Sequence, residues 1–166
     1  MIIRSEDAEG EAVLHVARLM VAAARTAPKA GGRDNIKCLI LTGEEKDRLA
    51  DAMGPEPEFN SRNVKDAGAI VLIGVDFGSP IEEWMNFKGK LIDFGIALGS
   101  AVKIASDLNV DNRIMWSAGR AAIKTGVMKA DEVQGIPIAI KGKNIFFDRY
   151  DPIIRGERKS QLRNDK

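Results

Sequence analysis

Ala69-Ile-Val-Leu-Ile-Gly-Val75 is the stretch that decides the fold, because it is a nearly continuous apolar run without the alternation of a half-exposed strand. Such a run predicts a β-strand that is buried on both faces of its sheet. The segments around it mix helices and strands without strict strand–helix–strand alternation. We therefore expect an α+β fold in which helices cover a sheet, rather than a doubly wound nucleotide-binding fold.

Two segments before this strand carry clear local signals. Apolar residues recur at helical spacing from Glu6 to Ala27, which predicts an amphipathic helix that Pro28 ends. Ile36 to Leu41 is short, apolar and rich in β-branched residues, so it predicts a strand. Thr42-Gly-Glu-Glu45 has the spacing of a capping box and predicts that Thr42 caps a helix over residues 44–53. A short helical turn is expected over residues 61–65.

The segments after the strand begin with Ser79-Pro-Ile-Glu82, a second helix start. A turn at Lys88-Gly-Lys90 then precedes the most hydrophobic helix, Leu91 to Leu108. Gly95 and Gly99 lie one turn apart on that helix, where they cost stability unless another backbone approaches closely. We therefore expect the helix to pack against a neighbour or a second subunit. The remaining predicted elements are a helix over residues 114–125 and strands over residues 135–140 and 144–147.

Composition and charge narrow the class of protein. The 25 basic and 24 acidic residues nearly cancel, which argues against nucleic acid as the main partner. No apolar run reaches the length of a membrane span, and the N-terminal residues lack the pattern of a signal peptide. One unpaired cysteine, Cys38, argues against an oxidising compartment, so we expect a cytoplasmic protein.

The length of 166 residues is typical of a single domain. We place this domain at residues 1–154. Residues 155–166 are almost entirely polar and carry an excess of basic side chains, so we expect a charged tail. Internal repeats and low-complexity blocks are absent from the sequence.

Standard catalytic and metal-binding motifs are also absent from the sequence. It contains no dinucleotide-binding glycine fingerprint, no phosphate loop and no paired-histidine helix. His15 is the single histidine, and we interpret it as a structural residue of the first helix. Cys38 lies inside an apolar strand, where a packing role is expected. One thiol does not supply the roughly four ligands of an iron–sulfur cluster, so we expect neither a cluster nor another metal site.

The order of several motifs over residues 10–145 is similar to that of the FMN-dependent nitroreductase family. An amphipathic helix leads to Ala27-Pro28 and a glycine loop, and Asp93-x-Gly-Ile-Ala97 lies on the buried helix. This resemblance implies an α+β sandwich with a mostly antiparallel central sheet. It also implies an intertwined homodimer that holds FMN between its subunits.

Three blocks resemble the signature of an uncharacterised prokaryotic family of ferredoxin-domain-containing proteins. The blocks span Asp93 to Ala101, Val110 to Met115 and Gly142 to Arg149. Those relatives carry several cysteines between the apolar strand and the long helix, but residues 74–90 of this chain contain none. The resemblance therefore implies a relative that lacks the cluster.

Two functions follow from the resemblance. The first is an FMN-binding oxidoreductase that acts on a small acceptor, with the flavin supplying the redox chemistry and no obligatory catalytic side chain. The second is a non-catalytic binding or accessory protein that kept the fold. For the first, a flavin phosphate needs cations and amide donors. The candidate cofactor-binding residues are Arg25, Lys29, Gly31, Gly32, Arg33 and Lys143. Each cation is alternatively a solvated surface charge.

The polar group Asp111-Asn112-Arg113 leaves two interpretations open. These residues either cap the next helix or line a pocket. Asp148-Arg149, which follows Asn144-Ile-Phe-Phe147, is interpreted as an internal ion pair that holds the last strand in place. The two tryptophans, Trp84 and Trp116, serve either the core and an interface or a planar ligand.

Overall fold

The structure is a computed structural model that describes residues 1–54, 58–78 and 84–147. A four-stranded antiparallel sheet forms its centre, in the order β1-β2-β4-β3. The α+β class and the antiparallel sheet were both expected and are confirmed. The strands are β1 (Ile36–Leu41), β2 (Ala69–Val75), β3 (Asp111–Asn112) and β4 (Glu132–Ala139).

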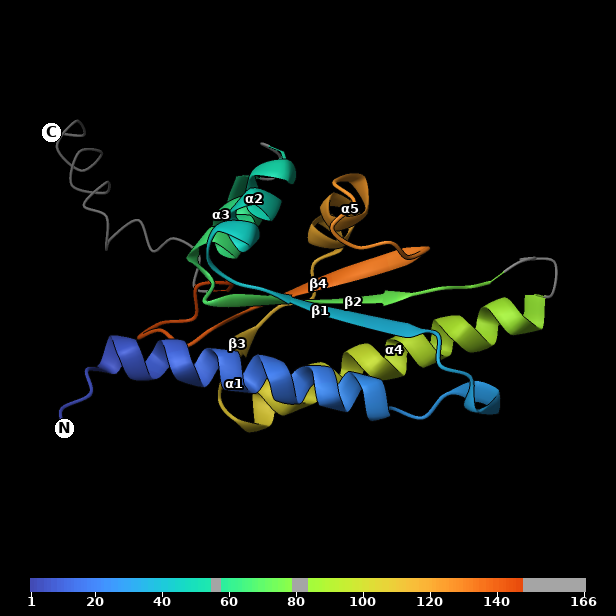
Figure 1. Cartoon of the computed structure of the whole chain (residues 1–166), viewed down its shortest axis with the longest axis horizontal. Coiled ribbons are helices and arrows are strands. Elements are labelled where there is room, and N and C mark those ends of the chain that lie inside the picture. Colours follow the sequence, from blue (N-terminus) through green and yellow to red (C-terminus); the bar gives the residue numbers. More distant parts are fainter. Residues whose placement is uncertain (55–57, 79–83, 148–166) are drawn as a thin grey trace, which may run out of the picture.

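Helices cover both faces of this sheet, as Figure 1 shows. One face carries two long helices, α1 (Ser5–Thr26) and α4 (Trp84–Asp107). The other face carries three shorter helices. These are α2 (Gly43–Ala52), α3 (Glu58–Asp66) and α5 (Trp116–Lys124).

Strand β2 is buried along its whole length, as its sequence predicts. It pairs with β1 on one side and with β4 on the other, so neither edge is free. Its alternate side chains enter two different cores. Ala69, Val71, Ile73 and Val75 pack with α1 and α4, whereas Ile70 and Leu72 pack with α2, α3 and α5.

Glycines allow the closest approach between α5 and β4. A Cβ atom on Gly119 would lie 1.7 Å from the carbonyl oxygen of Val133, so α5 packs with its backbone against the strand. On the facing strand, a Cβ atom on Gly135 would lie 2.7 Å from the Cβ of Ala118. The close packing of α5 on β4 therefore requires glycine at both positions.

Several local predictions were wrong. Thr42 is the N-cap residue of α2, but its side chain makes no capping hydrogen bond. Asp111 and Asn112 form the short strand β3 and do not cap α5, whose N-cap residue is Met115. Lys88-Gly-Lys90 lies inside α4 and forms no turn.

The predicted strand over residues 144–147 is a turn. The side-chain oxygen of Asn144 accepts hydrogen bonds from the backbone amides of Phe146 (3.0 Å) and Phe147 (3.1 Å). An asparagine that binds the following amides in this way favours a turn over a strand. The helix start at residues 79–82, the Asp148-Arg149 pair and the tail at residues 155–166 lie outside the described residues, as does the domain boundary at residue 154.

Replacing Gly119 with Ala tests the close packing of α5 on β4. The added methyl group collides with a backbone oxygen that has no space to move, so we expect a loss of about 3 kcal/mol or more in the free energy of unfolding. Gly10, which lies in α1 with nothing within 4 Å of an added Cβ, provides the matched control. Gly10→Ala should stabilise the protein by about 0.5–1 kcal/mol. Equal urea midpoints for the two variants would contradict the packing.

Candidate functional site

A glycine loop follows the end of α1 and contains the main group of candidate residues. It includes a short 3₁₀ turn, η1 (Ala30–Gly32). Gly31 and Gly32 have φ angles of 64° and 65°, in the left-handed region that favours glycine. An added Cβ would meet nothing within 4 Å at either position, so this part of the loop is open to an approaching ligand.

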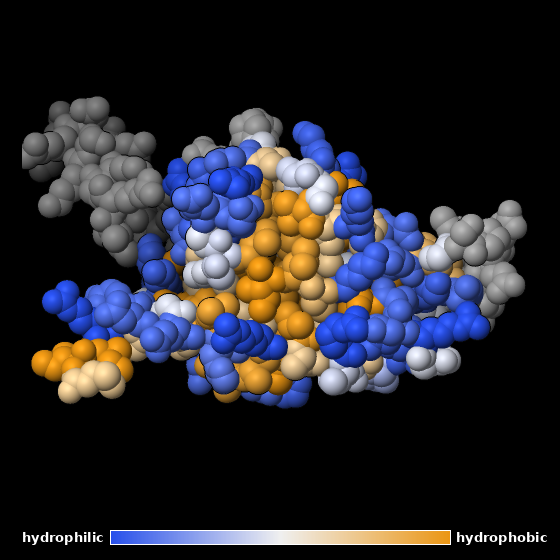
Figure 2. All heavy atoms as spheres, viewed as in Figure 1, coloured by the Kyte–Doolittle hydropathy of each residue, from blue (hydrophilic) through white to orange (hydrophobic). Residues whose placement is uncertain are grey.

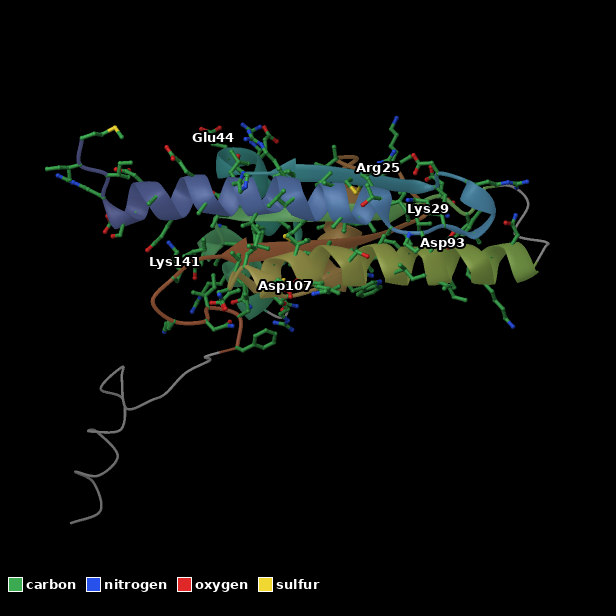
Figure 3. The ribbon with its side chains drawn as sticks, turned by 90° about the horizontal axis from the view of Figure 1, so that it is seen from below. Arg25, Lys29, Glu44, Asp93, Asp107 and Lys141 are labelled. Atoms are coloured by element: carbon green, nitrogen blue, oxygen red, sulfur yellow. The ribbon has the colours of Figure 1, made fainter. Side chains whose placement is uncertain are left out.

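A buried carboxylate holds the loop against α4. The backbone N–H of Ala30 donates to both oxygens of Asp93, at 2.9 and 3.1 Å. The exposed fraction of Asp93 is 5%, and Gly89, one turn earlier on α4, lies directly beneath Ala30. Figure 3 shows Lys29 on the loop close to Asp93 on the helix. The loop is therefore fixed to a long helix rather than suspended in solvent.

Two of the predicted phosphate-binding cations are engaged inside this loop. Arg25 donates to the carboxylate of Asp34 and to the carbonyl oxygen of Ile36, which joins the end of α1 to the start of β1. Lys29 donates from Nζ to the carbonyl oxygens of Arg25 (2.6 Å) and Ala27 (2.9 Å). A lysine in this position satisfies the last carbonyl groups of the helix. The structure therefore places both cations at the loop, where they stabilise it with most of their N–H donors.

Three residues of the loop, Ala30, Arg33 and Asn35, border a small polar cavity of about 70 Å³. Neither polar atom of the Asn35 side chain, Nδ2 or Oδ1, is exposed or hydrogen-bonded. A buried amide without a partner is costly, so this side chain is suited to a ligand or a water molecule that supplies both a donor and an acceptor. The cavity is lined by Ala30, Arg33, Asn35, Asn86, Gly89, Lys90 and Asp93.

Lys143 does not join this group in a single chain. It lies beyond the end of β4, next to Asn144, whose Nδ2 donates to Asp111 at 2.9 Å. That region borders the far end of α4 at Ser106. From Asp93 to Ser106 the helix rises by about 20 Å. Figure 3 shows the same separation, with Lys29 and Asp93 near one end of the molecule and Lys141 near the other.

Asn35 and Asp93 are site residues that the sequence pattern does not indicate. Asp93 lies within one of the family blocks, but its role depends on a contact across 63 residues of sequence. A carboxylate on an otherwise apolar helix face was the signal available, because a buried charge needs a partner.

The polar residues near Lys143 form a second hollow, of about 460 Å³. Asn109, with φ of 55°, and Asn112 lie in it beside Asp111 and Asn144. Two of the family blocks, at residues 110–115 and 142–149, therefore meet through the hydrogen bond between Asn144 and Asp111. The pocket interpretation of Asp111-Asn112 agrees with this arrangement.

An apolar groove of about 490 Å³ follows the outer edge of the sheet. Figure 2 shows an apolar band in the middle of this face, which crosses the position of β1 in Figure 1. Cys38 lines the groove and packs partly against the core, as expected. Burial raises the pKa of its thiol to about 11, despite the nearby Arg25. The neutral thiol therefore dominates at physiological pH, which disfavours a nucleophilic role.

The remaining candidates of the sequence have simple environments. His15 is exposed on α1. Trp116 is 57% exposed, and the guanidinium of Arg120 lies 4.9 Å from its ring; the side chain of Trp84 lies outside the described residues. Within the described ranges, no three His, Cys, Asp or Glu side chains are arranged to hold a metal ion. None of the helices in the described residues combines the length and the apolar character of a membrane span.

Sequence comparison identifies related proteins. A profile described as "Uncharacterized protein containing a ferredoxin domain (DUF2148)" matches residues 86–149. An uncharacterized protein of Archaeoglobus fulgidus is 35% identical over 180 residues, which cover 90% of this chain and 98% of the relative. Residues 86–149, which match the profile, include the three blocks that resemble the ferredoxin-domain family.

Structural comparison finds nitroreductase-like proteins. The hypothetical oxidoreductase YcnD from Bacillus subtilis has a TM-score of 0.61 at 16% identity, over 78% of this chain and 58% of that protein. This chain therefore spans less than two thirds of the length of YcnD. The nitroreductase family protein from Streptococcus pneumoniae TIGR4 has a TM-score of 0.60 at 15% identity, over 85% of this chain and 86% of that protein. These likenesses establish a nitroreductase-like fold.

Replacing Arg25 and Arg33 separately tests the structural role of Arg25. Arg25→Ala leaves the Ile36 carbonyl and Asp34 without their donor, so we expect the free energy of unfolding to fall by about 1 kcal/mol. Arg33 is exposed and makes no hydrogen bond or ion pair among the described residues. Arg33→Ala should change stability by less than about 0.5 kcal/mol in urea titrations. The same loss in both variants would contradict the distinction.

Proposed function

This chain belongs to the family of uncharacterized proteins containing a ferredoxin domain, and we propose that it is a nitroreductase-like oxidoreductase that binds FMN between two copies and acts on a small acceptor. The observation that carries the proposal is the position of the glycine loop. Asp93 holds the loop to α4, next to a helix face that stays uncovered in the single chain.

The uncovered face of α4 supports a homodimer. Leu91, Ile92 and Ile96 are 40%, 62% and 38% exposed. Gly95 and Gly99 lie within the same stretch, and nothing lies within 4 Å of an added Cβ at either. Exposed apolar side chains beside two open glycines allow a second helix to pack closely and to remove the side chains from water.

A second copy also explains how the separated candidates form one site. If the two α4 helices pack antiparallel about a two-fold axis near Gly99, the loop end of one copy approaches the Lys143 end of the other. The loop residues and Lys143 lie about 20 Å apart within one chain, but they come near each other across the interface of such a dimer. In this arrangement Arg33 and Asn35 of one copy and Lys143 of the other face the same ligand.

The outer edge of β1 is a second uncovered surface. The strand pairs with β2 on one side, and its other side forms the apolar groove beside Cys38 and Leu39. An open edge of this kind accepts an additional strand. We propose that an exchanged segment of the second copy occupies it, which would make the dimer intertwined.

The loop residues fit the chemical groups of FMN. Gly31 and Gly32 expose backbone without a side chain, and the guanidinium of Arg33 is exposed for a phosphate. The buried amide of Asn35 offers a donor and an acceptor to the polar edge of a ring. Arg25 and Lys29 fit less well because the loop already uses most of their N–H donors. Bound FMN would supply the hydride or electron chemistry. The protein would orient it and exclude water at the subunit interface.

A non-catalytic accessory protein is the second candidate function. The engagement of Arg25 and Lys29 inside the loop favours it, because two expected phosphate ligands are then missing. The single cysteine adds to this argument, since the chain by itself cannot supply the ligands of an iron–sulfur cluster. The same lone thiol supports a cytoplasmic location.

Binding of FMN tests the first function directly. Purified protein should quench the fluorescence of added FMN, and Arg33→Ala and Lys143→Ala should each weaken the affinity about tenfold or more by removing a charge-assisted contact. Lys124→Ala is the matched control, because Lys124 is an exposed lysine on the opposite face of the sheet. A wild-type protein that leaves FMN fluorescence unchanged would favour the accessory function.

Sedimentation equilibrium tests the dimer. The wild-type protein should have twice the mass of the chain, and Ile92→Lys should convert it to a monomer by placing a charge at the proposed contact. Val127→Lys is the control, because Val127 is 36% exposed but lies outside α4. A concentration-independent monomer mass for the wild-type protein would refute the roles of Ile92, Gly95 and Gly99. Equal dissociation in both variants would place the interface elsewhere.

A further inference from the structure

We propose that Asp93 is a positioning residue, whose buried carboxylate fixes the glycine loop so that Arg33 and Asn35 border the small polar cavity. The consequence for ligand binding rests on the function proposed above. The consequence for the loop does not, because it follows from contacts within one chain.

The geometry of Asp93 is that of a fixed anchor. Its carboxylate lies on α4 and is 5% exposed, and both of its oxygens lie within 3.1 Å of the Ala30 nitrogen. A buried carboxylate is costly without a hydrogen-bond donor. The N–H of Ala30 is such a donor, at the first residue of η1. Disrupting this contact therefore leaves the carboxylate without this donor and the amide without this acceptor.

The turn at residues 30–32 depends on this contact, because the hydrogen bonds of Arg25 and Lys29 hold only the residues before and after it. Lys29 precedes η1 without a side-chain capping bond, and two of the three residues of η1 are glycines in the left-handed region. Glycines lose the most conformational entropy on ordering. Within the turn, the amide of Gly32 donates to the carbonyl of Lys29 at 3.1 Å, but this bond is internal to the loop and does not attach it to another element. The bond to Asp93 joins the loop to a different element.

The same carboxylate borders the cavity that holds the buried amide of Asn35. Lys90, three residues before Asp93, also lines this cavity, and its Nζ donates to the carbonyl oxygen of Phe77. The walls of the cavity therefore come from the loop and from α4 together. A displaced loop would move Arg33 and Asn35 away from the helix and open the cavity.

Asp93 also lies next to the proposed dimer contact. Ile92 precedes it and is 62% exposed, so the two side chains leave α4 about 100° apart. One turn of helix thus carries both the anchor of the loop and part of the uncovered face. Correct placement of the loop relative to a second copy depends on this single turn.

The experiment compares Asp93→Ala with Asp93→Asn and with Asp107→Ala, an exposed aspartate on the same helix. Hydrogen exchange of the Ala30 amide should accelerate about tenfold or more in Asp93→Ala, because the amide loses its acceptor. Asp93→Asn should restore protection, since its side-chain oxygen accepts the same bond. Exchange of residues 141–147 should stay unchanged in all three variants. Unchanged exchange at Ala30 in Asp93→Ala would overturn the proposal.

Affinity for FMN provides the second measurement. Asp93→Ala should weaken binding about tenfold, and Asp93→Asn should bind within about threefold of the wild-type protein. If the Asn variant binds as weakly as the Ala variant while its loop is protected, Asp93 acts through its charge and positioning is refuted. If the wild-type protein binds no FMN, the proposed function fails, but the exchange of Ala30 still decides the role of Asp93.

Ala30→Pro removes the other partner and covers the case in which Asp93→Ala does not fold. Lys29 has a ψ angle of 138°, in the extended region that a following proline requires. Ala30→Pro, which lacks the N–H, should increase exchange at Gly31 and Gly32 and lower FMN affinity as much as Asp93→Ala does. The double variant should lose no more than either single variant, because both remove the same bond. Additive losses would contradict the proposal.

Discussion

The structure depends on the burial of β2 on both faces. This strand pairs on both edges and sends alternate side chains into two separate cores, so it joins the layer of α1 and α4 to the layer of α2, α3 and α5. A shift of the strand by one residue would exchange the side chains of the two cores, so its register is strongly specified. The order of the helices around the sheet follows from this one strand.

Helix α4 connects this framework to the candidate site. One side of the helix belongs to the core through Phe94, Ala97 and Ala101. Asp93 holds the glycine loop, and Ile92 and Ile96 remain exposed. Because successive residues of a helix point in directions about 100° apart, three different contacts arise within a single turn. The site therefore depends on the rigidity of α4 more than on the loop that carries it.

Prediction from the sequence succeeded for elements with a long hydrophobic pattern. It failed where a single tertiary contact determines the local structure. The apolar run of β2 and the periodic pattern of α1 predicted both elements nearly to their ends. Lys88-Gly-Lys90 has the composition of a turn, but Gly89 packs beneath Ala30 and Lys90 bonds to Phe77, so the helix continues through it. For the site, the glycine loop was identified correctly as a structural feature. The internal bonds of Arg25 and Lys29 were missed, because composition does not show which surface cation meets a carbonyl or a carboxylate.

The sequence by itself determined the α+β class, the family blocks and the single thiol, because each depends on residue types or on periodicity along the chain. Tertiary structure alone decided the partners of the charged residues. It joined Ala30 to Asp93 and Asn144 to Asp111, and it placed Lys143 about 20 Å along α4 from the loop. Hydrogen bonds and ion pairs require atoms to meet within about 3 Å, and residues far apart in sequence reach such distances only after the cores have packed.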